Sequence, residues 1–407
     1  MSYASVVPRS GHQLQLLEGS VELFPALVQA IDSAQREVRM ETYIFDLTGV
    51  GADVAWALER AAHRGVQVRV LVDGFGTQEL PAPWRERFAQ AGIEWRVYAP
   101  LGRLGVLWPG NWRRLHRKLF VIDGQIAFCG GINILDDFHD PGRAALKSPR
   151  LDFAVRVTGP LVDEVQATVS RLWLRVEALR KLRDVRVKSA IELLRAAGAG
   201  TDKTAMPGKP VRDRAHTRAA LVLRDNLRNR ARIERTYRRA IGRARKEIII
   251  ANAYFVPGRK MRQALISAAR RGVKVRLLLQ GRYEYFMQYY AARPIYGVLL
   301  ANGVEIHEYS PSYLHAKVAV IDEHWATVGS SNLDPLSLLL AREANVVIDD
   351  AQFARQLRNR LLYAMQYEGK AMDPAEYGNR PWRQRAMEWV ALILMRLALV
   401  VQGKKYL

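Results

Sequence analysis

Apolar residues follow two different periods along this chain, and the same succession of periods occurs twice. Residues 61–74, AAHRGVQVRVLVDG, illustrate the unit, in which an amphipathic helix ends near Arg64-Gly65 and an apolar strand follows at residues 66–72. Each half of the chain predicts helix, strand, helix, strand, helix and strand in turn, followed by a β-hairpin. Because helices alternate with strands, we predict an α/β fold with mixed β-sheets flanked by helices.

The repetition extends to the residues themselves. Residues 61–74 return as 268–281 (AARRGVKVRLLLQG), residues 41–46 (ETYIFD) as 252–257 (NAYFVP), and residues 91–100 (AGIEWRVYAP) as 302–311 (NGVEIHEYSP). An internal repeat of this kind predicts two similar lobes that arose by duplication. Two such lobes would be related by a pseudo-twofold axis and would form the functional site between them.

Four segments follow from these patterns. Residues 1–195 form the first lobe, which ends in a basic helical stretch at 161–195. Residues 196–218 contain Gly, Pro, Lys, Asp and Thr without periodicity, which is typical of a linker. Residues 219–370 form the second lobe, and residues 371–407 form a C-terminal segment that we assign to a membrane interface.

One motif recurs in both halves with identical internal spacing. Residues 116–133, HRKLFVIDGQIAFCGGIN, and residues 315–332, HAKVAVIDEHWATVGSSN, each contain His-x-Lys, an Asp five residues after the Lys, and a Gly-x-x-Asn ending. The shared positions are His116, Lys118, Asp123 and Asn133 in the first copy, and His315, Lys317, Asp322 and Asn332 in the second. Identical spacing in two copies marks these residues as the candidate site.

The spacing has a physical explanation. Apolar runs on both sides of Asp-Gly or Asp-Glu predict a β-hairpin, and residues two apart in a strand point to the same face. Each His therefore shares a face with its Lys. An imidazole can attack phosphorus or donate a proton, and an ammonium can neutralise phosphate oxygens. Asn133, Asn332 and the Ser330 hydroxyl can donate hydrogen bonds to the same phosphate.

The composition limits which partners and cofactors the protein can have. The chain has 407 residues with 62 Lys and Arg against 40 Asp and Glu, a net charge of +22, which favours nucleic acid or an anionic membrane surface. The single cysteine, Cys129, excludes an internal disulfide and predicts a buried, inert thiol. The six histidines outside the motifs form no metal-ligand pattern, so we expect no metal and no cofactor.

Two His-x-Lys-x4-Asp motifs with these endings are similar to those of the phospholipase D superfamily. The flanking stretches METYIFD, LHRK, NAYFVPG, EHWATVGSSNLDPLSL and REANVVI resemble bacterial cardiolipin synthases, in particular the short B-type form without N-terminal transmembrane helices. The resemblance covers about residues 13–368.

The resemblance implies a role for each matching position. One motif histidine attacks phosphorus to form a phosphohistidine, and the other is the acid and base; we assign His116 and His315 to these roles, and the reverse order stays open. Lys118, Lys317, Asn133, Asn332 and Ser330 would hold the phosphate, although the first copy has Gly131 where the second has Ser330. Asp123 and Asp322 complete the catalytic motifs, but we expect them to fix the hairpins. Asp152 and Glu343 match the positions that orient a motif histidine.

The reaction implied is the transfer of a phosphatidyl group from one phosphatidylglycerol to another, which gives cardiolipin and glycerol. Small alcohols such as glycerol are possible further acceptors. Two alternatives stay open: a phosphodiesterase that hydrolyses phospholipid or nucleic acid, and an inactive membrane-binding scaffold. The apolar C-terminus argues against nucleic acid, and the intact motifs argue against a scaffold.

Three stretches suggest contact with a membrane. Residues 101–115 and 283–300 mix aromatic, apolar and basic residues, which suits either a membrane interface or an ordinary half-buried segment. Residues 386–401 predict an apolar helix of about 24 Å, shorter than a bilayer core of about 30 Å, with Trp382 and Trp389 near one end. We therefore expect an interfacial helix and a peripheral enzyme on the cytoplasmic face of the bacterial membrane, in an oligomeric state that the sequence does not fix.

Overall fold

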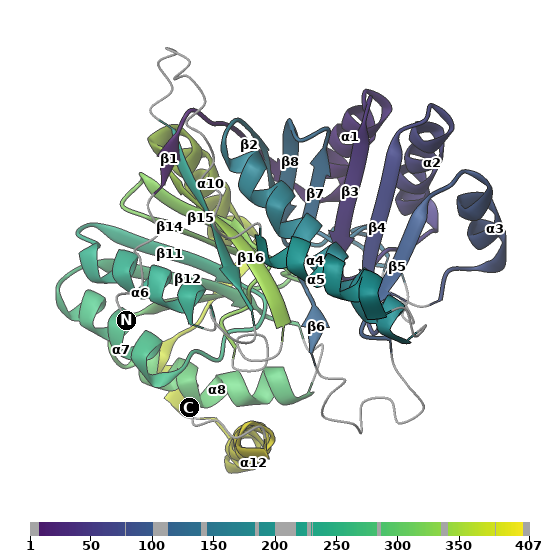
Figure 1. The fold of residues 1–407 in the computed structure, drawn as a ribbon. Coiled ribbons are helices and arrows are strands. Elements are labelled where there is room, and N and C mark those ends of the chain that lie inside the picture. The colour runs from purple at the N-terminus through teal and green to yellow at the C-terminus, as the bar shows by residue number, and fades with distance from the viewer. Residues whose placement is uncertain are drawn as a thin grey trace.

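The structure is a computed structural model that describes residues 8–77, 79–100, 113–139, 145–183, 187–199, 217–225, 229, 231–282, 286–334, 341–378 and 380–401. Two mixed β-sheets form its framework (Figure 1). The first has the strand order β2-β9-β8-β7-β3-β4-β5. These strands are β2 (Gln13–Glu18), β3 (Glu37–Thr42), β4 (Gln67–Asp73), β5 (Glu94–Tyr98), β7 (Lys118–Ile122), β8 (Ile126–Gly130) and β9 (Phe153–Thr158).

The second sheet repeats this order as β10-β16-β15-β14-β11-β12-β13, with β1 and β17 added at its two edges. In both sheets three consecutive strands toward one edge, β3-β4-β5 and β11-β12-β13, pair in parallel, and the other pairs along each strand order are antiparallel. The strands are β1 (Arg9–Ser10), β10 (Arg218–Arg224), β11 (Glu247–Asn252), β12 (Lys274–Gln280), β13 (Glu305–Tyr309), β14 (Lys317–Ile321), β15 (Trp325–Gly329), β16 (Ala341–Asp349) and β17 (Gly369–Ala371). The duplicated α/β fold with mixed sheets is confirmed.

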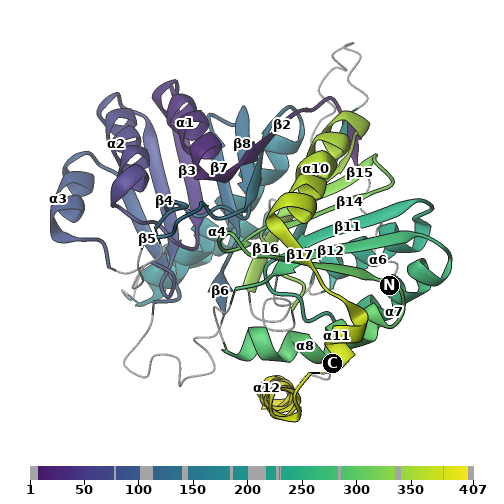
Figure 2. The ribbon, with the colours of Figure 1, turned by 180° about the vertical axis from the view of Figure 1, so that it is seen from behind.

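Helices cover the outer face of each sheet and close the junction between them. The outer layers are α1 (Gly19–Asp32), α2 (Gly49–His63) and α3 (Ala82–Gln90) on the first sheet, and α6 (Arg232–Arg243), α7 (Arg259–Arg270) and α8 (Phe286–Leu300) on the second. The inner faces of both sheets share one apolar core with α4 (Leu161–Arg183) and α10 (Ala351–Tyr363). Figures 1 and 2 show α4, with α5 (Val187–Ala199), and α10 on opposite sides of this junction.

The two predicted hairpins form as β7–β8 and β14–β15, and their turns explain the motif aspartates. Asp123 and Gly124 both have positive φ (52° and 67°), as do Asp322 and Glu323 (51° and 61°). A two-residue turn with two positive φ values matches the right-handed twist of the strands, and Asp tolerates that conformation better than most residues do.

The lobes exchange short segments, which departs from the predicted boundaries. β1 pairs with β10 of the second sheet, and β6 (Arg114–Leu115) pairs in parallel with the start of β16. A matching parallel bridge joins Leu151 of the first lobe to Leu314 of the second. At both contacts, the residues just before the motif histidine of one lobe pair with the residues just before the acidic residue of the other lobe.

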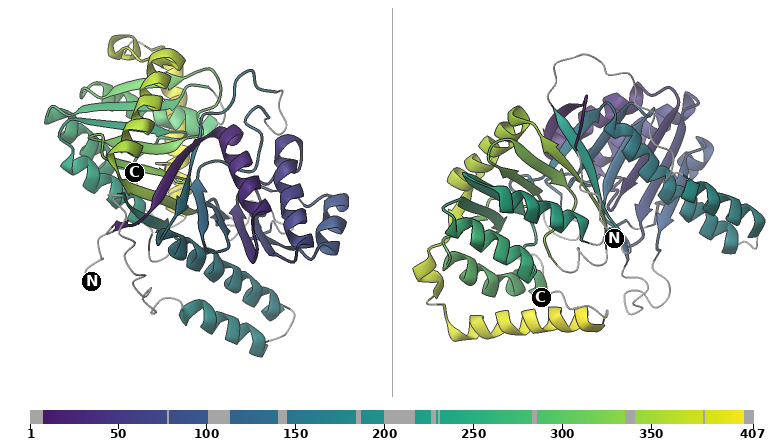
Figure 3. Two further views of the ribbon diagram at one scale, coloured as in Figure 1. Left: turned by 90° about the horizontal axis from the view of Figure 1, so that it is seen from above. Right: turned by 60° about the vertical axis from the view of Figure 1, so that its left-hand side comes forward.

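The C-terminal part follows α10 through a π-helical turn (Ala364–Glu368) to β17, α11 (Pro374–Gly378) and α12 (Trp382–Val401). α12 is a straight helix that packs against α8 at the surface of the second lobe (Figure 3). Among the described residues, no helix combines the length and the apolar character that are needed to cross a bilayer.

Candidate active site

The two motif histidines lie where the lobes exchange backbone hydrogen bonds. The amide of His116 donates to the carbonyl of Arg342 (3.1 Å), and the amide of His315 donates to the carbonyl of Leu151 (2.9 Å). In both cases the accepting residue immediately precedes the acidic residue of the opposite lobe. The chain therefore brings each histidine to the acid of the other copy by the same local geometry.

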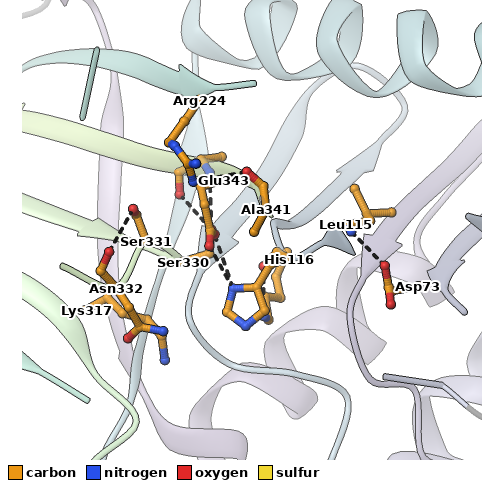
Figure 4. Close-up of polar contacts among 12 residues, drawn as sticks. Asp73, Leu115, His116, Arg224, Lys317, Ser330, Ser331, Asn332, Ala341 and Glu343 are labelled. Atoms are coloured by element: carbon orange, nitrogen blue, oxygen red, sulfur yellow. Dashed lines mark hydrogen bonds and ion pairs between the residues drawn. The ribbon is translucent and has the colours of Figure 1, made fainter. Parts of the chain in front are cut away.

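A buried carboxylate contacts each imidazole. Nδ1 of His116 lies 3.1 and 3.2 Å from the two carboxylate oxygens of Glu343 (Figure 4), and Nδ1 of His315 lies 2.5 Å from Oδ2 of Asp152. An Nδ1–H donated to a carboxylate leaves the Nε2 lone pair free to act as nucleophile or base. The structure thus pairs the residues across the lobes, Glu343 with His116 and Asp152 with His315.

The motif lysines contact the backbone of the motif histidines and are almost completely buried. Nζ of Lys118 donates to the carbonyl of His116 (2.8 Å), and Nζ of Lys317 donates to the carbonyl of His315. Lys317 also lies 4.0 Å from Oδ2 of Asp152. Burial, with repulsion from Lys317, lowers the pKa of Lys118 to about 7. Two ammonium groups in one buried site would be costly without an anion between them.

Burial also decides the protonation of the imidazoles. It lowers the pKa of His116, with help from the nearby Lys118, and it lowers that of His315 well below the ordinary value, with help from Lys317. Both imidazoles are therefore neutral near pH 7 in the free site. A phosphodiester placed between the lysines would raise both pKa values, because its negative charge favours the protonated imidazole.

The two acids differ in their surroundings. Burial raises the pKa of Asp152 to about 6 against the opposing effect of Lys317. Burial acts on Glu343 in the same direction, but His116, Lys118 and the Ser330 hydroxyl outweigh it, and the pKa of Glu343 is lowered. Glu343 is thus a fixed anion, whereas Asp152 can take up a proton at moderately acidic pH.

The difference between the copies at Gly131 and Ser330 fits these two acids. The Ser330 hydroxyl donates to Oε2 of Glu343, so it supports the acid rather than standing free for phosphate. A Cβ on Gly131 would lie 2.3 Å from Oδ1 of Asp152. Any side chain there would displace the carboxylate that holds His315, so the shorter acid and the glycine belong together.

The motif asparagines lie at the ends of the hairpins. Oδ1 of Asn133 accepts from the amide of Ile44 (3.2 Å), which ties the first hairpin to the segment after β3. Oδ1 of Asn332 is buried and has no hydrogen-bond partner among the described residues. Asn332 is thus buried at the site with an oxygen that no described residue satisfies.

The motif aspartates do not lie with the histidines and lysines. Asp123 accepts three backbone N–H bonds from residues 35–37 at 2.8 Å each, and Asp322 accepts the matching three from residues 245–247 at 2.8 to 3.0 Å. These bonds lower the pKa of both carboxyl groups despite partial burial. Their place among the catalytic residues is corrected: they fasten the hairpin turns at the opposite end of β7 and β14.

Two further residues at the site were not predicted from the sequence. The ring of Tyr43 lies 5.0 Å from the His116 ring and 5.4 Å from Nζ of Lys118. Buried Asp73 accepts from the amide of Leu115 (2.7 Å) and so positions the strand that leads into His116. Tyr43 lies within the repeated stretch ETYIFD, which could have indicated it, whereas nothing in the sequence relates Asp73 to Leu115.

The two aromatic and basic stretches that suggested membrane contact have different outcomes. Residues 101–112, Tyr283 and Tyr285 lie outside the described part of the chain. Tyr296 is buried. The guanidinium of Arg293 lies 4.4 Å from the centre of the Tyr289 ring and 5.5 Å from that of Tyr296, and it pairs with Glu308. For the described part of residues 283–300, ordinary packing is therefore the better interpretation.

The C-terminal helix is longer than predicted. It begins at Trp382, not at residue 386, and its 20 residues span about 30 Å, so the length of the helix alone does not exclude a membrane span. Glu388 does not interrupt an exposed apolar face, because it is buried and paired with Arg380. Ala391 and Leu392 pack inward, while the opposite face exposes Trp382, Met387, Trp389, Val390, Ile393 and Leu394.

Within the described residues, no group of three or more His, Cys, Asp and Glu side chains is arranged to hold a metal ion. Cys129 is buried in the shared core, and burial raises the pKa of its thiol to about 12, as expected of an inert thiol.

Comparison with known proteins follows the same division into two copies. The family model described as "Cardiolipin synthase, PLD-like domain" matches residues 27–140 and 237–364. The chain belongs to this family. Cardiolipin synthase B of Salmonella typhimurium is 38% identical over 385 residues, covering 92% of this chain and 85% of that protein. Cardiolipin synthase B of Escherichia coli K12 is 38% identical over 374 residues with the same coverage.

Cardiolipin synthase A of Cronobacter sakazakii is a more distant relative, 30% identical over 390 residues that cover 93% of this chain and 74% of that protein. Among solved structures, the phosphatidylserine synthase of Haemophilus influenzae superposes with a TM-score of 0.70 at 13% identity, covering 97% of this chain and 95% of its own. That likeness supports the fold. As a member of the cardiolipin synthase family, the chain is an enzyme of the phospholipase D superfamily.

Proposed function

We propose that this protein transfers a phosphatidyl group from one phosphatidylglycerol to a second, giving cardiolipin and glycerol. The observation that carries the proposal is the pair of buried imidazoles, each held at Nδ1 by a carboxylate of the opposite lobe. The family relationship supports the lipid substrate. The arrangement suits a double displacement, because one imidazole can carry the phosphatidyl group while the other moves protons.

In the first step, Nε2 of His116 attacks phosphorus and the bond from phosphorus to the glycerol oxygen breaks. His315, protonated once the anionic substrate lies between the lysines, gives its proton to that oxygen, and glycerol leaves. In the second step, a hydroxyl of another phosphatidylglycerol gives its proton to His315 and attacks phosphorus. The bond from phosphorus to His116 breaks, and cardiolipin and the free imidazole result.

The surroundings of the two acids support this order of roles. A nucleophilic histidine becomes cationic when it is phosphorylated, and the fixed anion of Glu343, held by Ser330, stabilises that charge. A histidine that gains and loses a proton is better served by Asp152, because the pKa of that carboxyl is raised to about 6. We therefore retain His116 as the nucleophile and His315 as the acid and base.

Lys118 and Lys317 would bind the non-bridging phosphate oxygens, with the Asn133 and Asn332 amides beside them. In the free site each lysine donates to the carbonyl of its own histidine. An incoming phosphate offers both ammonium groups a charged acceptor, and charge-assisted hydrogen bonds are about twice as strong as neutral ones.

We further propose that the enzyme works as a peripheral protein on the cytoplasmic face of an anionic membrane. The exposed face of α12 carries two tryptophans and four aliphatic side chains, and the whole chain carries a net charge of +22. Apolar contact with the acyl region and attraction to anionic headgroups add to each other. Glycerol would serve as an alternative acceptor if it reaches the site from the aqueous phase.

A lipid product assay tests the reaction. Full-length protein is incubated with phosphatidylglycerol vesicles, with and without glycerol, and the lipids are identified by mass spectrometry. We expect cardiolipin from the wild type, none from His116→Ala, and unchanged yield from the control His63→Ala, which alters an exposed histidine on α2. Phosphatidic acid as the only product would replace the synthase with a hydrolase. Cleavage of a nucleic-acid diester without lipid turnover would exclude both.

A further inference from the structure

A cavity lies in the second lobe, away from the catalytic groups. Its volume is about 730 Å³, and it is bounded by α6, the turn between β14 and β15, and the ends of β10 and β16. The β14 end that reaches it carries Asp322, five residues beyond Lys317, or about 16 Å along the strand. The cavity is therefore not part of the candidate active site.

The walls of the cavity combine an apolar floor with a cationic rim. Val347, Ile321, Ala240 and Ala244 line it together with the partly buried indole of Trp325, whose ring also contacts Tyr237 at 6.0 Å between centroids. The cationic side chains on the lining are Arg218, Arg239, Arg243 and Arg245, with His324 beside them.

The arginines of the rim are not neutralised by the acids nearby. In the described part of the chain, no carboxylate lies within ion-pair distance of Arg239, Arg243 or Arg245. The lining includes Asp322, but three backbone amides already occupy its carboxylate. Asp349 is the other acid on the lining, so four arginines face two acids.

The first lobe supplies an internal control, because it has the same scaffold without these charges. Asp123 accepts amides from residues 35–37 as Asp322 does from residues 245–247, which aligns Gln35 with Arg245. The same alignment places uncharged residues opposite the other cationic positions: Gln29 for Arg239, Ser33 for Arg243 and Gln125 for His324. The fold of a lobe thus does not require the cations, and their clustering around one cavity needs another explanation.

We propose that this cavity binds a phosphate group attached to a small organic moiety, with the arginines on the phosphate and the Trp325 indole against the organic part. Guanidinium groups match phosphate oxygens in bidentate geometry and remain charged at every physiological pH. The volume falls within the range of about 300 to 1,000 Å³ typical of small-molecule sites and exceeds what a bare phosphate ion fills. The phosphate can come from a soluble phosphomonoester or from a lipid headgroup.

The test uses the full chain and a variant that carries the residues of the first lobe, Arg239→Gln/Arg243→Ser/Arg245→Gln. The matched control removes three exposed cations elsewhere, Arg259→Gln/Lys260→Gln/Arg355→Gln. Glycerol 3-phosphate is titrated by calorimetry, and binding to vesicles of phosphatidylcholine with and without phosphatidylglycerol is measured by sedimentation. Thermal unfolding checks that all three proteins are folded. Binding that the two variants share with the wild type belongs to the active site.

We expect the cavity variant, and not the control, to bind glycerol 3-phosphate at least about tenfold more weakly than the wild type, because charged hydrogen bonds are lost. That result identifies a soluble phosphate ligand. If glycerol 3-phosphate distinguishes none of the proteins, but the cavity variant alone loses the preference for phosphatidylglycerol vesicles, the ligand is a lipid headgroup. Equal effects of the two variants in both assays, or no effect of either, would overturn the proposal.

Discussion

Glu343→Gln isolates the contact between the lobes that supports the proposed nucleophile. Glutamine keeps the size of the side chain and one carbonyl oxygen, but it removes the charge and presents an NH2 group that cannot accept the Nδ1–H of His116. At 3.1 Å and an effective dielectric constant of about 20, the carboxylate stabilises a cationic imidazole by about 5 kcal/mol. A neutral hydrogen bond returns about 1 kcal/mol. The net loss of about 4 kcal/mol predicts a fall in kcat of about three powers of ten.

Two substrates with different leaving groups distinguish the effect of Glu343→Gln from that of Asp152→Asn, which removes the acid beside His315. Initial rates are measured with phosphatidylglycerol and with phosphatidyl-p-nitrophenol, whose leaving group needs no proton. Glu343→Gln should be equally slow with both substrates, because it weakens the nucleophile. In the first turnover Asp152→Asn should release nitrophenol from this ester at close to the wild-type rate, because formation of the phosphohistidine then needs no acid. Only the second step, in which His315 acts as a base, should stay slow in this variant.

Glu192→Gln, which alters an exposed acid on α5, serves as the control for a lost charge, and urea unfolding checks the fold of each variant. If Glu343→Gln, and not Asp152→Asn, recovers activity with the nitrophenyl ester, the roles of the two histidines are reversed. If kcat of folded Glu343→Gln falls less than tenfold, Glu343 does not stabilise the cationic His116 as we infer.

Four further outcomes follow from the geometry. Gly131→Ser should lower kcat by about ten- to a hundredfold, because its Cβ would lie 2.3 Å from the Asp152 carboxylate; initial rates unchanged from wild type would contradict the packing argument. Asp322→Asn should lower the free energy of unfolding in urea by about 1 to 2 kcal/mol and leave kcat within about tenfold, whereas a selective loss of kcat would restore a catalytic role. In the free enzyme the Lys118 ammonium is lost as the pH rises through its pKa of about 7, so kcat/KM should fall above that pH. That limb should be absent from the residual activity of Lys118→Arg, and its persistence there would assign it to another group. Trp389→Glu on the exposed face of α12 should weaken sedimentation with anionic vesicles at least about tenfold without changing thermal unfolding; unchanged sedimentation would exclude this face as the membrane contact.

Much of the site was predictable because it is encoded locally. The strand period places His116 and Lys118 on one face, and the Asp-Gly and Asp-Glu pairs specify the tight hairpin turns, whatever the rest of the chain does. The duplicated sequence fixed the number of lobes and the order of their elements in the same way. These features depend on residues that are close in sequence, so their pattern survives in the sequence alone.

The partners of each histidine could not be obtained that way. The family resemblance implied that Asp152 and Glu343 orient the motif histidines, but only the tertiary structure placed each beside the histidine of the opposite lobe. The same holds for Ser330, whose hydroxyl faces Glu343, and for Asp73, which holds the backbone of Leu115. The contacts between histidines and acids join segments that meet only where the two lobes come together, whereas the Ser330 and Asp73 contacts depend on how strands pack within one lobe.

The C-terminal helix shows the same division. Its apolar composition is evident from the sequence, but the helix seemed interrupted by Glu388 until the structure placed that carboxylate against Arg380 on the buried side. Periodicity determines which residues a helix or strand presents on a common face. What that face meets depends on how distant parts of the chain pack, because burial, pairing and pKa are set by neighbours in space and not by neighbours in sequence.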